Sequence, residues 1–343
     1  MSKATLAVIA AASAATGAGV TALLYSSKSS PSSSSSSSSS SQTQTSSPQQ
    51  QGPPPPSIAG NVKVPTAIPT PALATKAVAV DGPVNPAGIL QYGFPGPIAD
   101  ELSTRALHGG YDRRTRNPAW VAEHITPQSL AMHNADRKHS TFAEDTSIPA
   151  LFRAKLADYF RSGYDRGHQV PAADAKWSQG AMDDTFYLSN MCPQVGEGFN
   201  RDYWAHFEDF CRKLATRYPS VRVVTGPMYL PHRDPDGKWR VNYEVIGTPP
   251  NVAVPTHFYK VIYAEDGTDS PTSKVALGAF VLPNARIPNE KSLSDFEVPL
   301  EAVERSTGLE FAAKLDPSRR RRLCQEIKCD IVVREFNNAR KRN

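Results

Sequence analysis

The chain has 343 residues and a formal net charge of +5. Four lysines and one aspartate lie within the first 86 residues, so this part carries +3 and the remainder only +2. A protein that binds nucleic acid through its bulk charge is more basic than this, so any polyanion binding has to come from a local patch. The part after residue 86 is long enough for a substantial core and shows no internal repeat.

Residues 4–25 carry no charge and, as a helix, are just long enough to cross a bilayer. They are rich in Ala, Gly, Ser and Thr, so insertion into a bilayer is only modestly favourable. Three interpretations stay open: a mitochondrial targeting segment and inner-membrane anchor over residues 1–25, which we favour, a cleaved secretory signal, or a matrix transit peptide. The absence of arginines argues against the last of these.

Residues 26–86 are mostly Ser, Pro, Gln and Thr, with an unbroken serine run at Ser32–Ser41 and a proline run at Pro53–Pro56. Such a segment has too little bulky apolar surface to offset the entropy lost on ordering, which predicts a disordered linker. We therefore expect a single folded domain at 87–315, followed by a basic tail at 316–343.

From residue 221 onward, apolar and polar residues alternate in four segments rich in Val, Ile, Tyr and Phe, a pattern typical of strands. The segments are Val221–Tyr229, Val241–Gly247, Val252–Asp266 and Lys274–Pro283. Turn sequences such as DPDGK and EDGTDS separate them, and no helix of crossover length does. We expect an α+β fold with a central antiparallel or mixed β-sheet flanked by helices.

Apolar residues recur every three or four positions in Pro149–Arg161 and in Asn200–Arg217, which predicts two helices. Asp316-Pro317 predicts the start of a third helix, in which Arg319–Arg322 form a solvated basic cluster. The tail is therefore expected to be helical at its beginning.

The four cysteines are spaced too irregularly for a disulfide framework or a zinc site. They are Cys192, Cys211, Cys324 and Cys329, and the last two, five residues apart, do not form a CxxC motif. We interpret all four as reduced, packed or incidental, which disfavours an ordinary secreted protein.

The stretch DRGHQVPAAD, Asp165–Asp174, holds residue types suited to phosphodiester hydrolysis. His168 has an ordinary pKa of about 6.5 and is able to act as a base near neutral pH. Arg166 offers the planar, two-point contact that phosphate oxygens accept. Gly167 permits a close backbone approach that a Cβ would hinder. Taken alone, the same sequence also fits a surface turn with an ordinary salt bridge.

Asn200, Trp204, Glu208 and Arg212 are spaced by four, so they form one stripe along a helix. Asn200, in the first turn, offers a neutral oxygen of the kind that Mg²⁺ accepts. The alternative interpretations are an N-cap asparagine and a structural i,i+4 pair between Glu208 and Arg212. We interpret Trp204 as a core residue.

Together these motifs resemble the active site of the ββα-metal DNA/RNA non-specific endonucleases. The set is DRGHQVPAAD, an LSN-x-x-PQ segment and an N-x-x-x-W-x-x-x-E-x-x-x-R pattern, in that order. The sequence around these motifs, including FRSGYDRGH and TGPMYLP, is similar to that of the mitochondrial endonuclease G branch, especially its fungal members. The resemblance runs from about Gln91 to Phe311 and implies a ββα-metal active-site motif.

The resemblance implies that His168 is the general base that activates water, and that Asn200 is the sole direct protein ligand of a single Mg²⁺ or Mn²⁺ ion. Glu208 and Arg212 match helix residues that hold metal-bound water and substrate.

Four further positions follow from the resemblance. Arg166 is placed near the scissile phosphate, and Arg137 falls where the family has another phosphate-facing arginine. Asp165 is expected to orient the loop and its arginine. Asn190 is expected to fix the two strands of the motif through hydrogen bonds.

The resemblance further implies cleavage of single- and double-stranded DNA and RNA to 5′-phosphate and 3′-hydroxyl ends by a homodimer. Contacts directed to phosphate and metal carry little base information, which agrees with such indifference to sequence. The expected location is the mitochondrial inner membrane, facing the intermembrane space. Release to the nucleus for DNA degradation in apoptosis is a further expectation.

The sequence departs from the family pattern in two places. Gly196-Glu197-Gly198 makes the link before Asn200 one residue longer than in bacterial and animal members, and the tail from Asp316 has no counterpart. Two other functions remain as alternatives. One is a catalytically silent nucleic-acid or partner-binding module of the same fold. The other is a serine or cysteine hydrolase using His168, for which no nucleophile-elbow signature is present.

Overall fold

The structure is a computed structural model that describes residues 83, 88, 91–92, 100–267 and 272–333. The predicted membrane segment at 1–25, nearly all of the linker at 26–86 and the last ten residues of the tail lie outside these residues. Within the described ranges, no helix combines the length and apolar character needed to cross a membrane.

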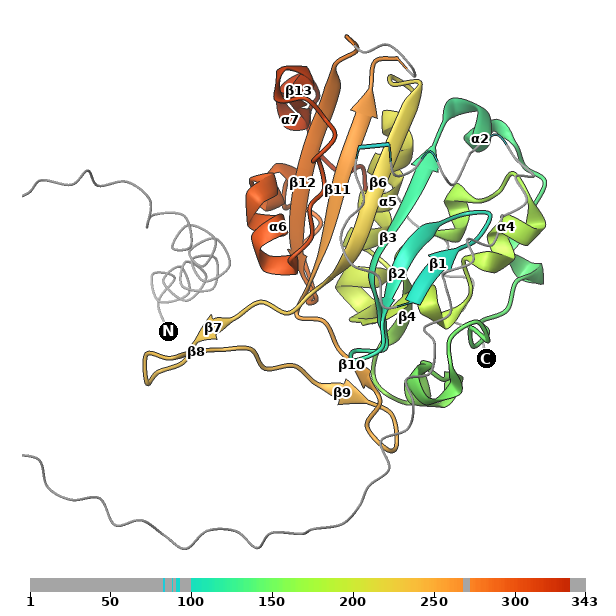
Figure 1. Cartoon of the computed structure of the whole chain (residues 1–343), viewed down its shortest axis with the longest axis vertical. Helices are drawn as coiled ribbons and strands as arrows, with labels where there is room; N and C mark the ends of the chain where they lie inside the picture. The colour runs from blue at the N-terminus through green and yellow to red at the C-terminus, as the bar shows by residue number, and fades with distance from the viewer. Residues whose placement is uncertain (1–82, 84–87, 89–90, 93–99, 268–271, 334–343) are drawn as a thin grey trace, which may run out of the picture. The chain divides into compact units, whose positions relative to one another are not determined.

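A seven-stranded sheet in the order β1-β2-β3-β6-β11-β12-β13 forms the centre of the domain (Figure 1). Every neighbouring pair is antiparallel except β12 and β13, which are parallel. The sheet is therefore mixed, and the predicted α+β class is confirmed. Its strands are β1 (Asp100–Ser103), β2 (His108–Asp112), β3 (Asn117–Ile125), β6 (Ser220–Met228), β11 (His257–Glu265), β12 (Val275–Pro283) and β13 (Arg320–Arg322).

Helices cover both faces of this sheet. On one face, α5 (Tyr203–Leu214) packs Trp204 against Phe258 of β11, with 5.5 Å between the ring centroids. Trp204 is fully buried, which confirms its assignment to the core. On the other face, Val303 of α6 (Leu300–Thr307) joins a second core that includes Val261.

The predicted helix at Pro149–Arg161 is wrong. The chain forms only a 3₁₀ turn at Ala150–Phe152 and one α-helical turn, α3 (Leu156–Tyr159). The side chain of Asp158 accepts a hydrogen bond from the backbone N–H of Lys155, which starts the second turn separately. Leu151 and Phe160 remain strongly exposed, so no apolar face exists to hold a continuous helix against the core.

The predicted strand at Val241–Gly247 is reduced to β9 (Val245–Ile246), which pairs only with β10 (Val252–Ala253). It lies on an arm that also carries the hairpin of β7 (His232–Arg233) and β8 (Trp239–Arg240) and extends away from the central sheet (Figure 1). The rest of the alternating segment has no neighbouring long strand with which to pair.

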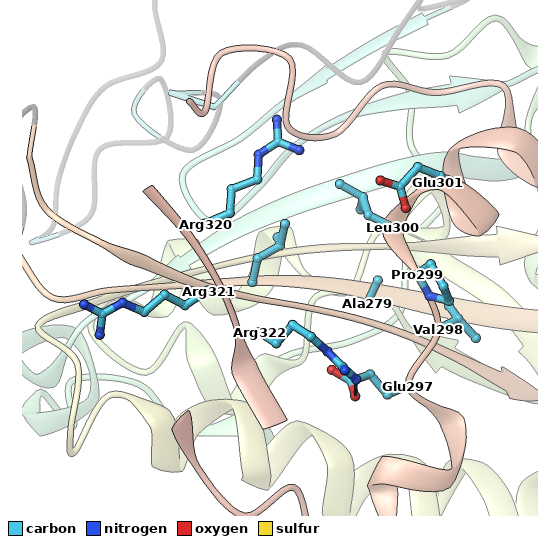
Figure 2. Close-up of a pocket in the computed structure, with 10 residues that line it drawn as sticks. Ala279, Glu297, Val298, Pro299, Leu300, Glu301, Arg320, Arg321 and Arg322 are labelled. Carbon is cyan, nitrogen blue, oxygen red and sulfur yellow. Dashed lines mark hydrogen bonds and ion pairs between the residues drawn. The ribbon is translucent and has the colours of Figure 1, made fainter. Parts of the chain in front are cut away.

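The predicted helix after Asp316 is also wrong. Asp316 caps a 3₁₀ turn at Pro317–Arg319, and Arg320–Arg322 then pair in parallel with the open edge of β12. The edge offers backbone hydrogen bonds that a helix would forgo. Figure 2 shows this strand beside a cavity of about 470 Å³, lined partly by Glu297 and Leu300. None of the predicted site residues lines it.

The interpretation of all four cysteines as reduced needs correction. Cys324 and Cys329 form a disulfide because the chain turns through α7 (Leu323–Glu326) and brings their Cα atoms to 5.2 Å. A spacing of five residues carries no recognisable motif, so this turn could not be anticipated from local sequence. Cys192 and Cys211 are free and buried, as interpreted.

Candidate active site

A β-hairpin of β4 (Asp165–His168) and β5 (Met191–Gln194) carries the DRGH motif, with His168 opposite Met191. Gly167 faces Cys192 in this pairing, yet its closest neighbour is the side chain of Gln194. A Cβ on Gly167 would lie 2.0 Å from Oε1 of Gln194, so any other residue at this position collides with a buried side chain. The hairpin leads directly toward α5, which completes a β-β-α arrangement.

Two phenylalanines flank the imidazole of His168. Phe186 contacts it edge to face at 4.9 Å between ring centroids, and Phe142 lies at 5.6 Å. The ring is 7% exposed, and within the described part of the chain its Nε2 atom has no hydrogen-bond partner. The Nε2 side of the ring is therefore enclosed without a hydrogen bond to a described residue.

The two predicted phosphate-binding arginines stack on these same phenylalanines. The guanidinium carbon of Arg166 lies 4.1 Å from the ring centroid of Phe142, and that of Arg137 lies 5.2 Å from that of Phe186. Burial, together with the positive charges of Arg137 and Arg166, lowers the pKa of His168 to about 3. His168 is consequently neutral at physiological pH, the protonation state that a base requires.

Asn190 fixes the segments on either side of the hairpin. Its Nδ2 donates to the carbonyl oxygens of Val170 at 2.9 Å and Thr185 at 2.8 Å, and its Oδ1 accepts from the Val170 N–H at 3.0 Å. Its own carbonyl accepts from the backbone of Gln169 at 3.0 Å. Every polar group of this buried side chain is engaged in holding the turn that follows His168.

Asp165 joins the hairpin to the segment that contains Asn200. Its Oδ2 accepts from Nδ2 of Asn200 at 2.8 Å and from Nε of Arg201 at 2.7 Å, while Oδ1 accepts from Nη2 of Arg201. The carboxylate is thus directed to Asn200 and Arg201, and the described interactions include none between it and Arg166. Arg201 was not predicted from the sequence, although it directly follows the predicted metal ligand.

Asn200 does not lie in the first turn of α5 but in a separate wide turn, Gly196–Asn200, that precedes it and has non-helical backbone at Glu197 and Gly198. The backbone N–H of Asn200 donates to the carbonyl of Val195 at 2.9 Å, five residues back. This wide turn contains the Gly196-Glu197-Gly198 sequence. Gly198 adopts a φ of 79°, and a Cβ there would lie 2.3 Å from Cγ of Arg286, so both conformation and space require glycine.

Helix α5 brings Glu208 and Arg212 to the same region. Nη1 of Arg212 donates to Oδ1 of Asp174 at 2.8 Å, and the alternative interpretation, an i,i+4 pair of Arg212 with Glu208, is not among the ion pairs of the described residues. Burial raises the pKa of Glu208 to about 7, against the opposing charges of Lys260, Arg212 and Arg137. Since the charge of Arg137 also acts on His168, the hairpin and the helix share one electrostatic environment.

The donor set fits a hard divalent cation in an open site. The Nδ2 of Asn200 is held by Asp165, and its Oδ1 accepts no hydrogen bond from any described residue, which leaves a neutral oxygen available. No group of three or more His, Cys, Asp or Glu residues in the described ranges is arranged to enclose a metal. Mg²⁺ commonly binds through one or two protein oxygens with waters and phosphates, so one amide oxygen is compatible with it.

Several contacts of the site escaped sequence reasoning. Asp174 ends the quoted DRGHQVPAAD motif but was assigned no role, and Phe142, Phe186 and Arg201 were not singled out. The proximity of Asp174 to Arg212, 38 residues apart, depends on the folded domain. Only the adjacency of Arg201 to Asn200 offered a signal in the sequence.

Comparisons with known proteins agree with this geometry. Residues 85–318 match the profile of the DNA/RNA non-specific endonuclease family. The chain is 65% identical to a mitochondrial nuclease of Saccharomyces cerevisiae over 75% of this chain and 78% of that protein. It is 45% identical to a mitochondrial endonuclease G of Caenorhabditis elegans, over 69% of this chain and 75% of that protein.

A crystal structure of an EndoG/EndoGI complex superposes with a TM-score of 0.66 at 45% identity, covering 70% of this chain and 99% of that chain. A likeness at this identity supports both the fold and the family. Since the family profile also spans most of the described residues, the chain belongs to the DNA/RNA non-specific endonuclease family.

Proposed function

We propose that the chain is a Mg²⁺- or Mn²⁺-dependent endonuclease that hydrolyses phosphodiester bonds in single- and double-stranded DNA and RNA and leaves 5′-phosphate ends. The observation that carries this proposal is the β-β-α arrangement that holds a neutral His168 and an Asn200 with an unengaged Oδ1 atom. Asp165 ties the two together, because it precedes His168 on β4 and binds Asn200.

In the proposed reaction His168 acts as the general base. Its imidazole takes a proton from water, and the flanking Phe142 and Phe186 fix the direction of the ring. The guanidinium groups of Arg166 and Arg137 are positioned to bind phosphate oxygens and to offset the negative charge that develops on the phosphorus-bound oxygens.

Asn200 would hold the divalent ion through Oδ1, and Glu208 would orient water bound to it. When bound, the ion supplies Lewis-acid support for the departing 3′ oxygen. Arg212 would contact the substrate from α5, with Asp174 directing its guanidinium group. None of these groups reads a base edge, which agrees with cleavage that ignores sequence and sugar.

The direct test is cleavage of plasmid DNA and of RNA by the purified full-length chain. We expect both to be degraded with Mg²⁺ or Mn²⁺, to leave 5′-phosphates, and to be protected by EDTA. Normal nucleic-acid binding without metal-dependent cleavage would instead favour the silent binding module. Turnover of ester substrates without nucleic-acid cleavage would favour the hydrolase alternative.

We further propose a mitochondrial location at the inner membrane facing the intermembrane space, with release to the nucleus in apoptosis. The names of relatives such as the mitochondrial nuclease of S. cerevisiae support the organelle. The membrane attachment rests on the uncharged segment at 4–25. Fractionation of mitochondria, with N-terminal sequencing of the mature protein, tests both points; recovery of the protein in the secretory pathway would contradict them.

We also propose a homodimer, as the family resemblance implies. The arm described above exposes Trp239, Val241, Tyr243 and Val245, each more than 40% exposed and spaced by two, which is the kind of apolar surface that an oligomer covers. Light scattering coupled to size-exclusion chromatography should give twice the chain mass. A monomer at micromolar concentration would contradict the proposal.

A further inference from the structure

A buried carboxyl group lies beneath the proposed site and takes no part in the reaction as described. Glu123, on the central strand β3, is 3% exposed and faces the same core as α5. Burying an ionised carboxylate without hydrogen-bond donors or a paired cation is strongly unfavourable. The protonation state of this side chain therefore depends on the groups around it.

The nearest cation does not pair with it. Lys260, on β11, is 1% exposed and directs its Nζ to Oγ1 of Thr225 at 2.9 Å and toward the ring of Trp204, with 4.8 Å to the centroid. Among the described residues no ion pair links Lys260 to Glu123. An ionised Glu123 would thus lack the direct partner that compensates a buried charge.

The side-chain hydrogen-bond partner of Glu123 is another carboxyl group, that of Asp174. The two side chains are within hydrogen-bonding contact. Oε2 of Glu123 and Oδ2 of Asp174 are both buried, and neither receives a hydrogen bond from an N–H or O–H of another described residue. Two carboxylates cannot bond to each other, but a carboxylic acid and a carboxylate can, through one proton.

We propose that Glu123 is a positioning residue: it holds a proton at neutral pH, donates it to Oδ2 of Asp174, and thereby fixes Asp174 so that its Oδ1 binds Arg212. Burial and the negative charge of Asp174 both raise the pKa of Glu123 well above its usual range, which agrees with the protonated state. The nearby Glu208 acts in the same direction, and Lys260 opposes it.

This chain of contacts has a consequence for the site. Asp174 lies six residues after His168, and Arg212 lies on α5 with Glu208, so the Asp174–Arg212 pair joins the two halves of the site. Glu123 anchors that pair to the rigid sheet. The inference rests on the proposed function in one respect, the role of Arg212 toward substrate; the proton on Glu123 does not depend on it.

The test compares Glu123→Gln, which keeps a neutral donor, with Glu123→Leu, which removes it. We expect Glu123→Gln to keep kcat within about threefold, because one neutral donor replaces another toward the Asp174 carboxylate. Glu123→Leu should lower kcat by about 10- to 100-fold with a smaller change in KM, because a displaced Arg212 acts on the reacting substrate. Equal losses of kcat in the two variants would overturn the proposal.

A spectroscopic measurement tests the proton itself, independent of cleavage. The infrared difference spectrum of wild type minus Glu123→Gln at pH 7, recorded without metal, should contain the carbonyl stretch of a protonated carboxylic acid. Absence of that band would overturn the proposal even if both variants are active. If wild type cleaves no nucleic acid, the proposed function fails, and this spectrum still decides the state of Glu123. The spectrum also decides the protonation state of Glu123 in the case that Glu123→Leu does not fold.

Glu265→Gln provides a matched control. Glu265 is 1% exposed on the same sheet, but it forms an ion pair with Arg222. The same substitution there replaces an ionised carboxylate with a neutral amide. We expect Glu265→Gln to lower Tm by about 10 °C without removing the carboxylic acid band. Glu123→Gln should leave Tm nearly unchanged, and a comparable fall in Tm would indicate that Glu123 is ionised after all.

Discussion

At the scale of single residues, the site depends on a few positions where side chains approach very closely. Gly167 precedes His168 and leaves room for the buried side chain of Gln194. Its role is spatial rather than conformational, since β4 is ordinary extended strand. The position of the proposed general base is therefore coupled to a residue on the opposite strand.

This coupling gives a prediction for Gly167→Ala. The new Cβ would meet Gln194 at 2.0 Å, so the hairpin has to open. We expect a loss of stability of about 1–3 kcal/mol and a fall in kcat of about 10²-fold as His168 is displaced. The measurements are Tm and steady-state cleavage.

The double variant Gly167→Ala/Gln194→Ala supplies the control. Neither polar atom of the Gln194 amide has a hydrogen-bond partner among the described residues, so its removal mainly creates space. We expect the double variant to regain most of the lost kcat. A double variant that is as inactive as Gly167→Ala would argue against a steric cause.

At the scale of elements, the wide turn at Gly196–Asn200, before α5, contains Asn200. Gly198 within this turn has a φ of 79°, which costs a residue with a Cβ about 1–2 kcal/mol. We expect Gly198→Ala to raise the Mg²⁺ concentration needed for half-maximal cleavage, because strain in the turn moves Asn200. A metal titration of cleavage measures this.

Gly308 is a suitable comparison, because it has a φ of 73° at the C-terminal end of α6 and a Cβ added there would meet no atom within 4 Å. Gly308→Ala should lower Tm by the conformational cost alone and leave the Mg²⁺ dependence unchanged. If both variants shift the Mg²⁺ dependence equally, the turn has no specific role in presenting the ligand.

The sequence predicted the elements whose burial pattern is regular. The long strands β6, β11 and β12 and the amphipathic helix α5 have such patterns, because each is nine residues or longer and packs one face or both on the core. The strands β1, β2 and β3 were not predicted, although β3 is also nine residues long. In β2 the sequence HGGYD carries two glycines, and Gly109 is required because a Cβ would lie 2.5 Å from the carbonyl of Trp120.

The site was predictable to the extent that its residues share local motifs. His168 and Asn200 stand in such motifs, whereas the pairs Asp165–Arg201 and Asp174–Arg212 join residues 36 and 38 positions apart. Those contacts follow from how β4 and α5 pack, which no local pattern encodes. The disulfide Cys324–Cys329 depends in the same way on the turn made by α7.

At the scale of the whole molecule, buried histidines predict sensitivity to acid. Burial and the charge of Arg222 lower the pKa of His124 to about 3, and burial lowers that of His257 to about 4. In the unfolded chain both take up a proton below about pH 6.5. Between pH 6.5 and 4 the unfolded state therefore binds more protons than the folded state.

Stability should consequently be insensitive to these groups above pH 6.5 and fall as the pH is lowered from 6.5 toward 4. Each histidine contributes a slope of up to about 1.4 kcal/mol per pH unit. Urea unfolding at several pH values measures this. Substituting His124 or His257 by Gln should flatten the profile, and substituting the exposed His133 should not. Stability that rises on acidification through this range would contradict the assignment.

The central claim is that His168 is the general base of a metal-dependent nuclease. It is tested most directly by the rate of plasmid cleavage by His168→Ala at saturating Mg²⁺, with circular dichroism to verify the fold. Loss of a general base predicts a rate at least about 10²-fold lower than wild type. Undiminished cleavage by the folded variant would contradict the account.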